Sequence, residues 1–253
     1  MASPFLNIDH FKISKAVFPP HPLAGFSAVT YLFEDSPNGL RTRDSLGDNS
    51  ELKGGDLHWT LAGRGLVHEE VPLDSPLPVE GLQVFVNLKE KNKNLDPASF
   101  HVESLHAPRV VTRNGAAVKV CAGSYGGMHA PFRLPEETDL YDVAMDVGAS
   151  FPLSLRAKSG GLLYVLSGSV TVDCESSFSV ATGSAVAFRV KDPTEVVIRA
   201  RTQAKLVVLQ GNVTDEPVVF QGPFAMTNVE AVEAARKRFQ EGKMGRLDPL
   251  GNS

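Results

Sequence analysis

Two short segments of the chain carry side chains that could bind a metal ion. The first holds His21, and the second, a strand-like run from Leu66 to Pro72, holds His68 and Glu70. On a strand, residues i and i+2 point to the same face, which would place His68 and Glu70 in one interior, with Cα atoms about 6–7 Å apart. Two imidazoles and a carboxylate form the ligand set of a non-haem Fe(II) site with open positions. We therefore take His21, His68 and Glu70 as candidate metal ligands; a surface pair is the alternative interpretation of His68 and Glu70.

Strands must position these side chains, because the apolar segments of the chain are short and are bounded by glycine, proline, asparagine or aspartate. The segments richest in Val, Leu, Tyr and Phe are Ser27–Phe33, Leu82–Leu88, Ala117–Ala122 and Gly161–Val172. Many short strands separated by turn signals favour a β-sandwich or barrel. The chain lacks the helical pattern of about 10–15 residues after each strand that a parallel α/β sheet requires. We predict an all-β fold.

A weak internal repeat divides the chain. Residues 31–35 and 164–168 each lead from a strand into a turn, and residues 54–59 and 182–188 each lead from a turn into a strand. The offset is about 130 residues in both comparisons, which predicts two similar all-β halves. We place the domains at residues 1–115 and 116–253.

One helix is predicted, from Thr227 to Gly242. Thr227 and Glu230 are spaced as a capping box, and basic residues follow in the later turns. Three apolar residues lie roughly on one of its faces: Val229, Val232 and Phe239. This pattern is typical of a helix that docks on a sheet, and we assign it to the second domain.

The histidines restrict any imidazole metal site to the first half. All seven lie at or before residue 129: His10, His21, His58, His68, His101, His106 and His129. We interpret His58 as an exposed strand histidine, because its side chain should point away from that of Trp59. Glu69 alternates with His68 and should face outward. Arg64 lies between two glycines, where its guanidinium could bind a carboxylate and shape the site.

Composition and charge exclude several classes of protein. The chain has 253 residues, 42% of them hydrophobic and 21% charged, which is ordinary for a globular protein. A net charge of −4 argues against direct nucleic-acid binding through bulk positive charge. No apolar run approaches the length of about 18 residues that a membrane helix needs, and no charged leader precedes Pro4. Two cysteines fit a reducing compartment, and we expect an intracellular protein without a membrane partner.

The sequence resembles the pirin family over nearly its whole length, from His21 to about Gly245. The matching segments are HPLAGFSAVTYLFED, RDSLGD, GGDLHWTLAGRGLVHEEVP, GLQVFVNL and EPVVFQGPFAMTN. The resemblance implies two tandem cupin domains (jelly-roll β-barrels) with a C-terminal helix, and an Fe(II) site in the N-terminal barrel. Pirins hold this metal with three histidines and one glutamate, in a His-Pro-His stretch and a later His-x-Glu. Their counterparts here are His21, Leu23, His68 and Glu70.

Leu23 is the departure from the family pattern, because an isobutyl group has no lone pair to donate. The chain keeps three of the four protein ligands, so we expect Fe(II) to bind weakly or not at all. Removing a hydrogen-bond partner of a ligand already costs about 10–100-fold in metal affinity, and losing a ligand itself should cost at least as much.

The resemblance implies two functions for the chain. The first is a regulatory or binding protein of the transcriptional co-regulator type, which contacts a protein partner and does not itself touch DNA. The alternative is an iron-dependent quercetin 2,3-dioxygenase-like oxidoreductase, in which the apolar barrel binds a flavonol-like aromatic ligand. A third interpretation is that the barrel has lost its metal and serves as a structural or small-ligand module. We expect a monomer in the cytoplasm, the nucleus or both.

Overall fold

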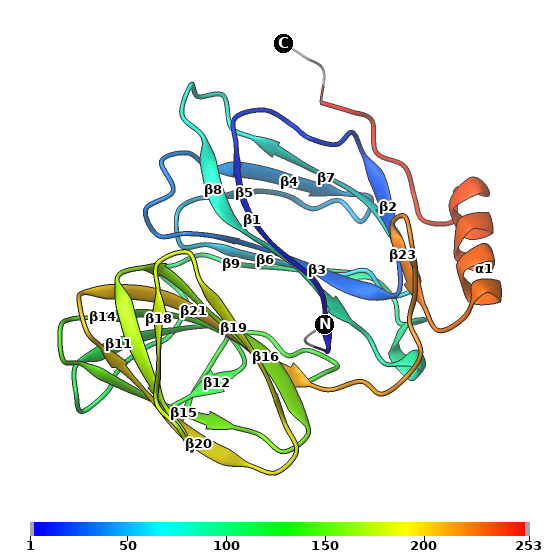
Figure 1. The fold of residues 1–253 in the computed structure, drawn as a ribbon. Coiled ribbons are helices and arrows are strands. Elements are labelled where there is room, and N and C mark those ends of the chain that lie inside the picture. The colour runs from blue at the N-terminus through cyan, green and yellow to red at the C-terminus, as the bar shows by residue number, and fades with distance from the viewer. Residues whose placement is uncertain (1–2, 251–253) are drawn as a thin grey trace. The chain divides into compact units, whose positions relative to one another are not determined.

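The computed structural model describes residues 3–250, which form antiparallel strands and one C-terminal α-helix (Figure 1). The chain divides into two compact units. We call residues 5–105 together with 214–250 the N-terminal barrel, and residues 106–213, which cluster with residues 3–4, the central barrel. The prediction of an all-β fold with a C-terminal helix is confirmed.

The N-terminal barrel is built from two antiparallel sheets. The five-stranded sheet has the order β1 (Phe5–Ile13), β8 (Val79–Asn87), β3 (Phe26–Leu32), β6 (Leu57–Leu61) and β9 (Ala98–Val102). The four-stranded sheet has the order β2 (His21–Leu23), β7 (Leu66–Pro72), β4 (Leu40–Asp44) and β5 (Asn49–Leu52). A 3₁₀ helix, η1 (Glu90–Asn92), follows β8. Between the sheets lie apolar side chains and several polar ones, among them His68 and Glu70.

The central barrel repeats this arrangement. Its six-stranded sheet has the order β10 (Arg109–Val111), β11 (Ala116–Ala122), β14 (Thr138–Met145), β21 (Ala204–Asn212), β16 (Ser159–Ser167) and β19 (Ala185–Val190). Its four-stranded sheet has the order β15 (Ser150–Leu155), β20 (Thr194–Ala200), β17 (Ser169–Asp173) and β18 (Phe178–Ala181). A small hairpin joins β12 (Ser124–Tyr125) and β13 (Met128–His129). One continuous apolar cluster, which includes Phe151 and Ile198, fills the interior between the sheets.

The internal repeat of the sequence corresponds to equivalent central strands. β3 lies between β8 and β6 in the first barrel, and β16 lies between β21 and β19 in the second. The predicted segment from Gly161 to Val172 is two strands rather than one. The break falls at Gly168, whose φ is +79°, and an added Cβ there would lie 2.0 Å from the carbonyl oxygen of Gln203. Only glycine fits this turn, so β16 ends before it and β17 begins after it.

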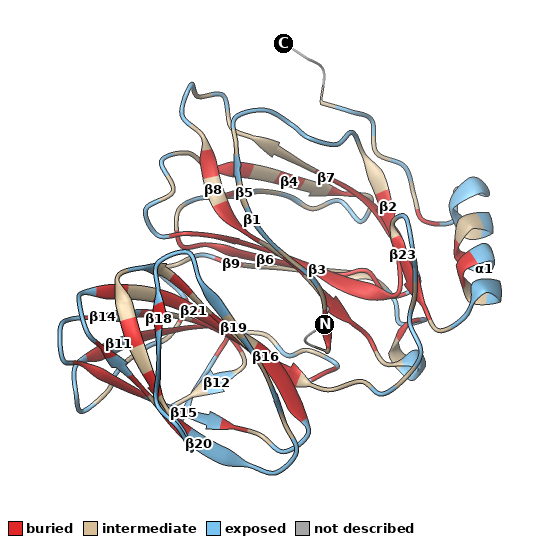
Figure 2. Cartoon of the chain, in the orientation of Figure 1, coloured by how far each residue is buried: buried red, intermediate tan, exposed pale blue. Residues whose placement is uncertain are grey.

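The end of the chain packs on the N-terminal barrel. The hairpin of β22 (Val219–Gln221) and β23 (Phe224–Met226) leads into α1 (Val229–Gln240). Val232 and Ala235 of α1 join a buried cluster with Ala24, Val67 and Met226, whereas the outer face of the helix is exposed (Figure 2). The sequence analysis assigned this helix to the second domain. Its buried face instead contacts strands of the first, and the central unit begins at residue 106 rather than 116.

The N-cap of the helix lies one residue later than predicted. Asn228 is the N-cap, and its side-chain oxygen accepts a hydrogen bond from the backbone N–H of Ala231. Val229 and Phe239, which were expected on the docking face, remain 52% and 39% exposed. The buried stripe is therefore narrower than the pattern suggested. No helix in the described part of the chain is long and apolar enough to cross a membrane.

A buried lysine ties the chain end to the barrel. Lys93 is 3% exposed, and its ammonium donates to the carbonyl oxygens of Gly25 (2.7 Å) and Ala225 (2.8 Å) and to Asn87 Oδ1 (2.6 Å). Gly25 itself has a φ of +86°, and an added Cβ would lie 2.0 Å from the Ala225 oxygen. These contacts fix the turn between β2, which carries His21, and β3.

Candidate metal centre

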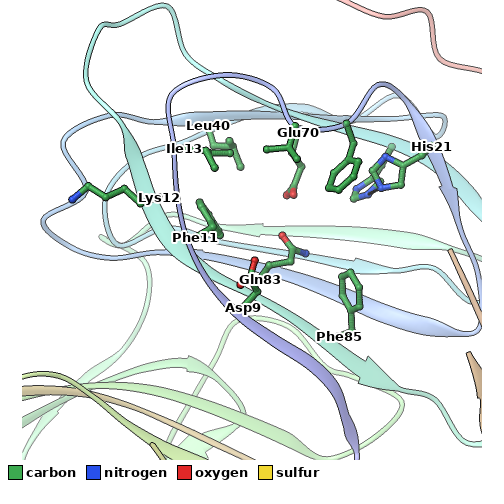
Figure 3. Close-up of a pocket in the computed structure, with 12 residues that line it drawn as sticks. Asp9, Phe11, Lys12, Ile13, His21, Leu40, Glu70, Gln83 and Phe85 are labelled. Carbon is green, nitrogen blue, oxygen red and sulfur yellow. Dashed lines mark hydrogen bonds between the residues drawn. The ribbon is translucent and has the colours of Figure 1, made fainter. Parts of the chain in front are cut away.

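A cavity of about 370 Å³ lies between the two sheets of the N-terminal barrel. Its apolar wall consists of Phe11, Ile13, Val17, Phe18, Leu40 and Phe85. Its polar side chains are Asp9, Lys12, His21, His68, Glu70 and Gln83 (Figure 3). All three predicted ligands thus line one cavity. An apolar pocket of this size with a few polar groups is typical of a small-molecule site.

His21 and His68 face each other across the β2–β7 pair, in which they are directly opposite. Their Nε2 atoms are 3.1 Å apart. His21 Nδ1 lies 3.0 Å from the carbonyl oxygen of Pro19, which can only accept a hydrogen bond, so Nδ1 carries the proton and Nε2 presents its lone pair. A ligand histidine usually donates its other ring N–H to a carbonyl in this manner. The tautomer of His21 is therefore the one that a metal requires.

The separation of the two Nε2 atoms fits adjacent positions around a metal ion. Nitrogens bound at about 2.1 Å and at a right angle would lie about 3.0 Å apart. Burial lowers the pKa of His68 well below its usual value, and the neighbouring rings of His21 and His58 add to this effect. His68 is therefore neutral near pH 7, the form that can bind a metal.

Glu70 is fixed in place by a hydrogen bond from the Thr30 hydroxyl. The Thr30 hydroxyl on β3 lies between the Glu70 carboxyl group and the side-chain amide of Gln83, 3.0 Å from Gln83 Oε1. Because a hydroxyl has one hydrogen, Thr30 can donate to an ionised Glu70 while the amide group of Gln83, turned over, donates to Thr30. Burial raises the pKa of Glu70 to about 7, and the Thr30 hydrogen bond opposes this rise. Thr30 and Gln83 thus orient the candidate carboxylate ligand.

Replacing Thr30 with valine is expected to weaken metal binding about tenfold, because Glu70 would lose the hydrogen bond that orients it. Thr30→Ser keeps a hydroxyl at the same place and should retain most of the affinity. Titration of both variants with Co(II), followed by visible absorption, measures the effect. Equal affinities for the two variants would show that the hydroxyl does not position Glu70.

Leu23, the predicted counterpart of the fourth ligand, is a buried aliphatic side chain. It is 2% exposed and packs in an apolar cluster with Phe26, Ala28, Ala62 and Ala225. As residue i+2 of His21 on β2, it shares the face of that histidine. The position is packed with carbon and offers no donor atom.

The residues present fit two adjacent metal positions and not a complete site. Within residues 3–250, no group of three or more histidine, cysteine, aspartate or glutamate side chains is gathered tightly enough to hold a metal ion. The Nε2 atoms of His21 and His68 lie 3.1 Å apart, whereas the Glu70 carboxyl group accepts a hydrogen bond from Thr30. The donor set is therefore that of a weak site.

His58 is a residue that the sequence analysis placed wrongly. It was expected to be exposed, but it is 1% exposed and lies inside the barrel, opposite Thr30 on the neighbouring strand β3. All five residues of β6 are buried, so both faces of this strand are covered. The rule that His58 should be exposed because Trp59 is buried therefore fails. Thr30 and Gln83 were also missed, since a single polar residue in an apolar strand gives no signal of its partners.

The buried His58 predicts an acid-sensitive barrel. Burial lowers the pKa of His58 to about 4, and the carboxylate of Asp48 offsets part of this effect. Because the pKa of the folded state lies below the unfolded value of 6.5, the contribution of His58 to stability is present above pH 6.5 and is lost as the pH falls through 4. Between pH 7 and pH 4.5 we expect it to fall by about 2 kcal/mol.

The measurement is urea unfolding of wild type and His58→Gln, followed by the fluorescence of Trp59, the single tryptophan. Wild type should be the more stable protein at pH 7, and the difference between the two free energies of unfolding should shrink on acidification. The comparison removes the opposing titration of Glu70, which both proteins share. A difference in the free energy of unfolding that is constant with pH would contradict a lowered pKa for His58 in the folded protein.

Two other residues considered from the sequence lie outside the pocket. Arg64 binds a carboxylate as expected, that of Asp96 at 2.9 Å, but its side chain is 60% exposed and does not line the cavity. Glu69 points away from the pocket as expected, but it is buried, because it pairs with Arg43, which also bonds to the carbonyl oxygen of Asp248. The chain end thus covers Glu69.

Comparison with known proteins decides the family. The Pirin family model matches residues 1–86, and the Pirin C-terminal cupin domain model matches residues 140–245. Mouse pirin is 31% identical over 252 residues, which are 96% of this chain and 83% of the mouse protein. The chain belongs to the pirin family. A Pseudomonas aeruginosa protein named as a proposed quercetin 2,3-dioxygenase is 34% identical, over 94% of this pirin and 86% of its own length.

Solved structures agree with the fold of this pirin. A quercetin 2,3-dioxygenase from Acinetobacter baumannii superposes with a TM-score of 0.82 at 27% identity, covering 96% of this chain and 87% of the other. A bacterial pirin from Escherichia coli, solved in complex with nickel(II), has a TM-score of 0.62 at 17% identity, covering 81% and 80%. The prediction of two cupin barrels is confirmed.

Proposed function

We propose that this pirin is a regulatory binding protein whose N-terminal barrel takes a small planar ligand beside a weak metal site. His21, His68 and Glu70 would hold the metal, which we take to be Fe(II). The observation that supports this most strongly is Leu23. A packed aliphatic side chain at the fourth corner lowers the affinity for metal without closing the cavity. Ligand binding can then be retained where metal chemistry is reduced.

The chemistry of the cavity suggests the ligand class. Phe85, Phe11 and Phe18 offer aromatic surfaces, while Gln83 and the histidine pair supply hydrogen-bonding groups. A flat aromatic molecule that carries hydroxyl groups at one edge matches this distribution, and a flavonol is one such molecule. The regulatory function also involves a protein partner, and we expect a monomer that is present in the cytoplasm, the nucleus or both.

A quercetin 2,3-dioxygenase-like activity is the second candidate. The named relatives favour it, as does the apolar cavity that ends at two imidazoles. In that case a bound metal would activate the flavonol toward oxygen, while the apolar wall orients the ring and Glu70, with its raised pKa, is suited to accept the proton of a flavonol hydroxyl.

Three measurements on one sample separate the two functions. They are the metal content after purification without chelator, the dissociation constant for quercetin, and oxygen uptake after anaerobic loading with Fe(II). The regulatory proposal predicts less than one metal ion per chain, saturable quercetin binding and no oxygen uptake. Sustained oxygen uptake with loss of the flavonol spectrum would establish the enzyme instead. Absence of quercetin binding with and without Fe(II) would overturn both.

A further inference from the structure

The loop between β1 and β2 carries two large apolar side chains that the rest of the chain leaves uncovered. Val17 is 57% exposed and Phe18 is 63% exposed. Both residues nevertheless line the cavity of the N-terminal barrel. Exposed apolar surface that gathers at one place often marks a binding site. Because these two side chains border the cavity, a molecule bound there would cover them.

Phe18 stands beside the candidate metal ligand His21. The centroids of the two rings are 5.7 Å apart, and their planes are inclined at 60°. In such an edge contact, at least one face of the phenyl ring stays clear of the imidazole. The next residue, Pro19, accepts the hydrogen bond from His21 Nδ1 through its carbonyl oxygen. This bond anchors the loop beside the histidine pair, with Phe18 directly before the anchor.

Phe85 provides an aromatic surface from the other sheet of the barrel. It belongs to β8 of the five-stranded sheet, whereas His21 belongs to β2 of the four-stranded sheet, and both line the cavity (Figure 3). Phe85 packs against Phe26 and Phe220, with centroid distances of 4.8 and 6.3 Å. The ring of Phe85 is therefore supported from behind, whereas that of Phe18 is open to solvent. A flat ring system between them would contact aromatic carbon on both sides.

We propose that Phe18 determines the specificity of this cavity for planar ligands, by closing over a bound ring system that rests on Phe85. The inference depends on the ligand class given under the proposed function. Within the described part of the chain, no backbone–backbone hydrogen bond ties residues 14–18 to a strand, so this loop can follow a ligand without disturbing a sheet. A puckered molecule with the same polar groups would lose contact with one of the two phenyl rings.

The test compares quercetin with taxifolin, which carries the same hydroxyl groups but has a central ring that is not flat, because one of its double bonds is saturated. Isothermal titration calorimetry gives both dissociation constants, in chelator and again after anaerobic loading with Fe(II). Wild type is expected to prefer quercetin. Phe18→Ala should weaken quercetin binding about tenfold and taxifolin binding much less, so that most of the preference disappears. Phe18→Tyr keeps a ring and should keep the preference.

Phe178→Ala is the matched control, because Phe178 is a 39% exposed phenylalanine of the central barrel. It should bind both flavonoids as wild type does. Since Phe18 is mostly exposed, Phe18→Ala should also unfold at the same urea concentration as wild type, which separates weaker binding from loss of folding.

Two kinds of failure are distinguishable. If wild type binds quercetin but does not prefer it to taxifolin, or if Phe18→Ala keeps the preference of wild type, Phe18 does not select the ligand, while the proposed function stands. If wild type binds neither flavonoid, with or without Fe(II), the proposed function fails and the role of Phe18 fails with it.

Discussion

Leu23→His is expected to raise the metal affinity of this pirin by at least 10–100-fold, the cost typical of losing even a hydrogen-bond partner of a ligand. The imidazole would stand on the same face of β2 as His21, whose Nε2 is already 3.1 Å from that of His68. Protein purified without chelator should then carry close to one ion per chain in the pocket. Elemental analysis and Co(II) titration measure the change.

The control for this variant is Leu23→Phe, which brings a ring of similar shape without a lone pair. Both variants disturb the apolar cluster around Leu23, so both should lower the free energy of unfolding by about 1–3 kcal/mol in the presence of chelator. Added metal should restore stability to Leu23→His alone, since a metal that binds the folded state stabilises it. If the histidine variant gains no metal, Leu23 does not adjoin the coordination sphere.

Lys93→Met is expected to lower the free energy of unfolding of the N-terminal barrel by about 3 kcal/mol. The methionine fills a similar volume, but two backbone carbonyls and the Asn87 side chain would lose their buried donor. One of these carbonyls belongs to Ala225, so the hairpin of β22 and β23 should loosen together with the turn at Gly25. Urea unfolding followed by Trp59 fluorescence reports this barrel, because the tryptophan is buried within it.

Lys91→Met is the matched control, two residues away in η1 on an exposed position. It should change the free energy of unfolding by less than about 0.5 kcal/mol, as surface substitutions usually do. Equal stability of the two methionine variants would mean that the ammonium of Lys93 contributes nothing net to the barrel. Protease digestion of the hairpin residues 214–226 gives a second readout, and cleavage should be faster only in Lys93→Met.

The strands and the candidate ligands could be predicted because their signals are local. Runs of Val, Leu and Tyr between turn residues indicated β3 and β8, and the i, i+2 rule placed His68 and Glu70 on one face. His21 was joined to them by residue type as a ligand from a neighbouring strand, and its contact with His68 depends on the pairing of β2 with β7, which the sequence did not predict. The interpretation of Leu23 as the fourth corner remains a prediction.

The features that the sequence did not predict depend on contacts between distant segments. His58 could be placed only when the register of β6 against β3 and β9 was known, because both faces of β6 are buried. The hydrogen bond from Thr30 to Glu70 joins strands 40 residues apart. The destination of α1 was missed for the same reason: its apolar face fits a sheet, but nothing in the helix itself says which barrel supplies that sheet.

The way the N-terminal barrel is assembled has a consequence for the order of events during translation. The strands of its two sheets come from residues 5–105, but Ala225, which accepts from Lys93, and the α1 residues that cover Val67 follow the central barrel in the chain. The central barrel consists of residues 106–213 with residues 3–4, so all of it is synthesised before residues 214–250. The N-terminal barrel is therefore completed after the central barrel, and a nascent chain that stalls before the helix should expose an unfinished pocket although its central barrel has folded.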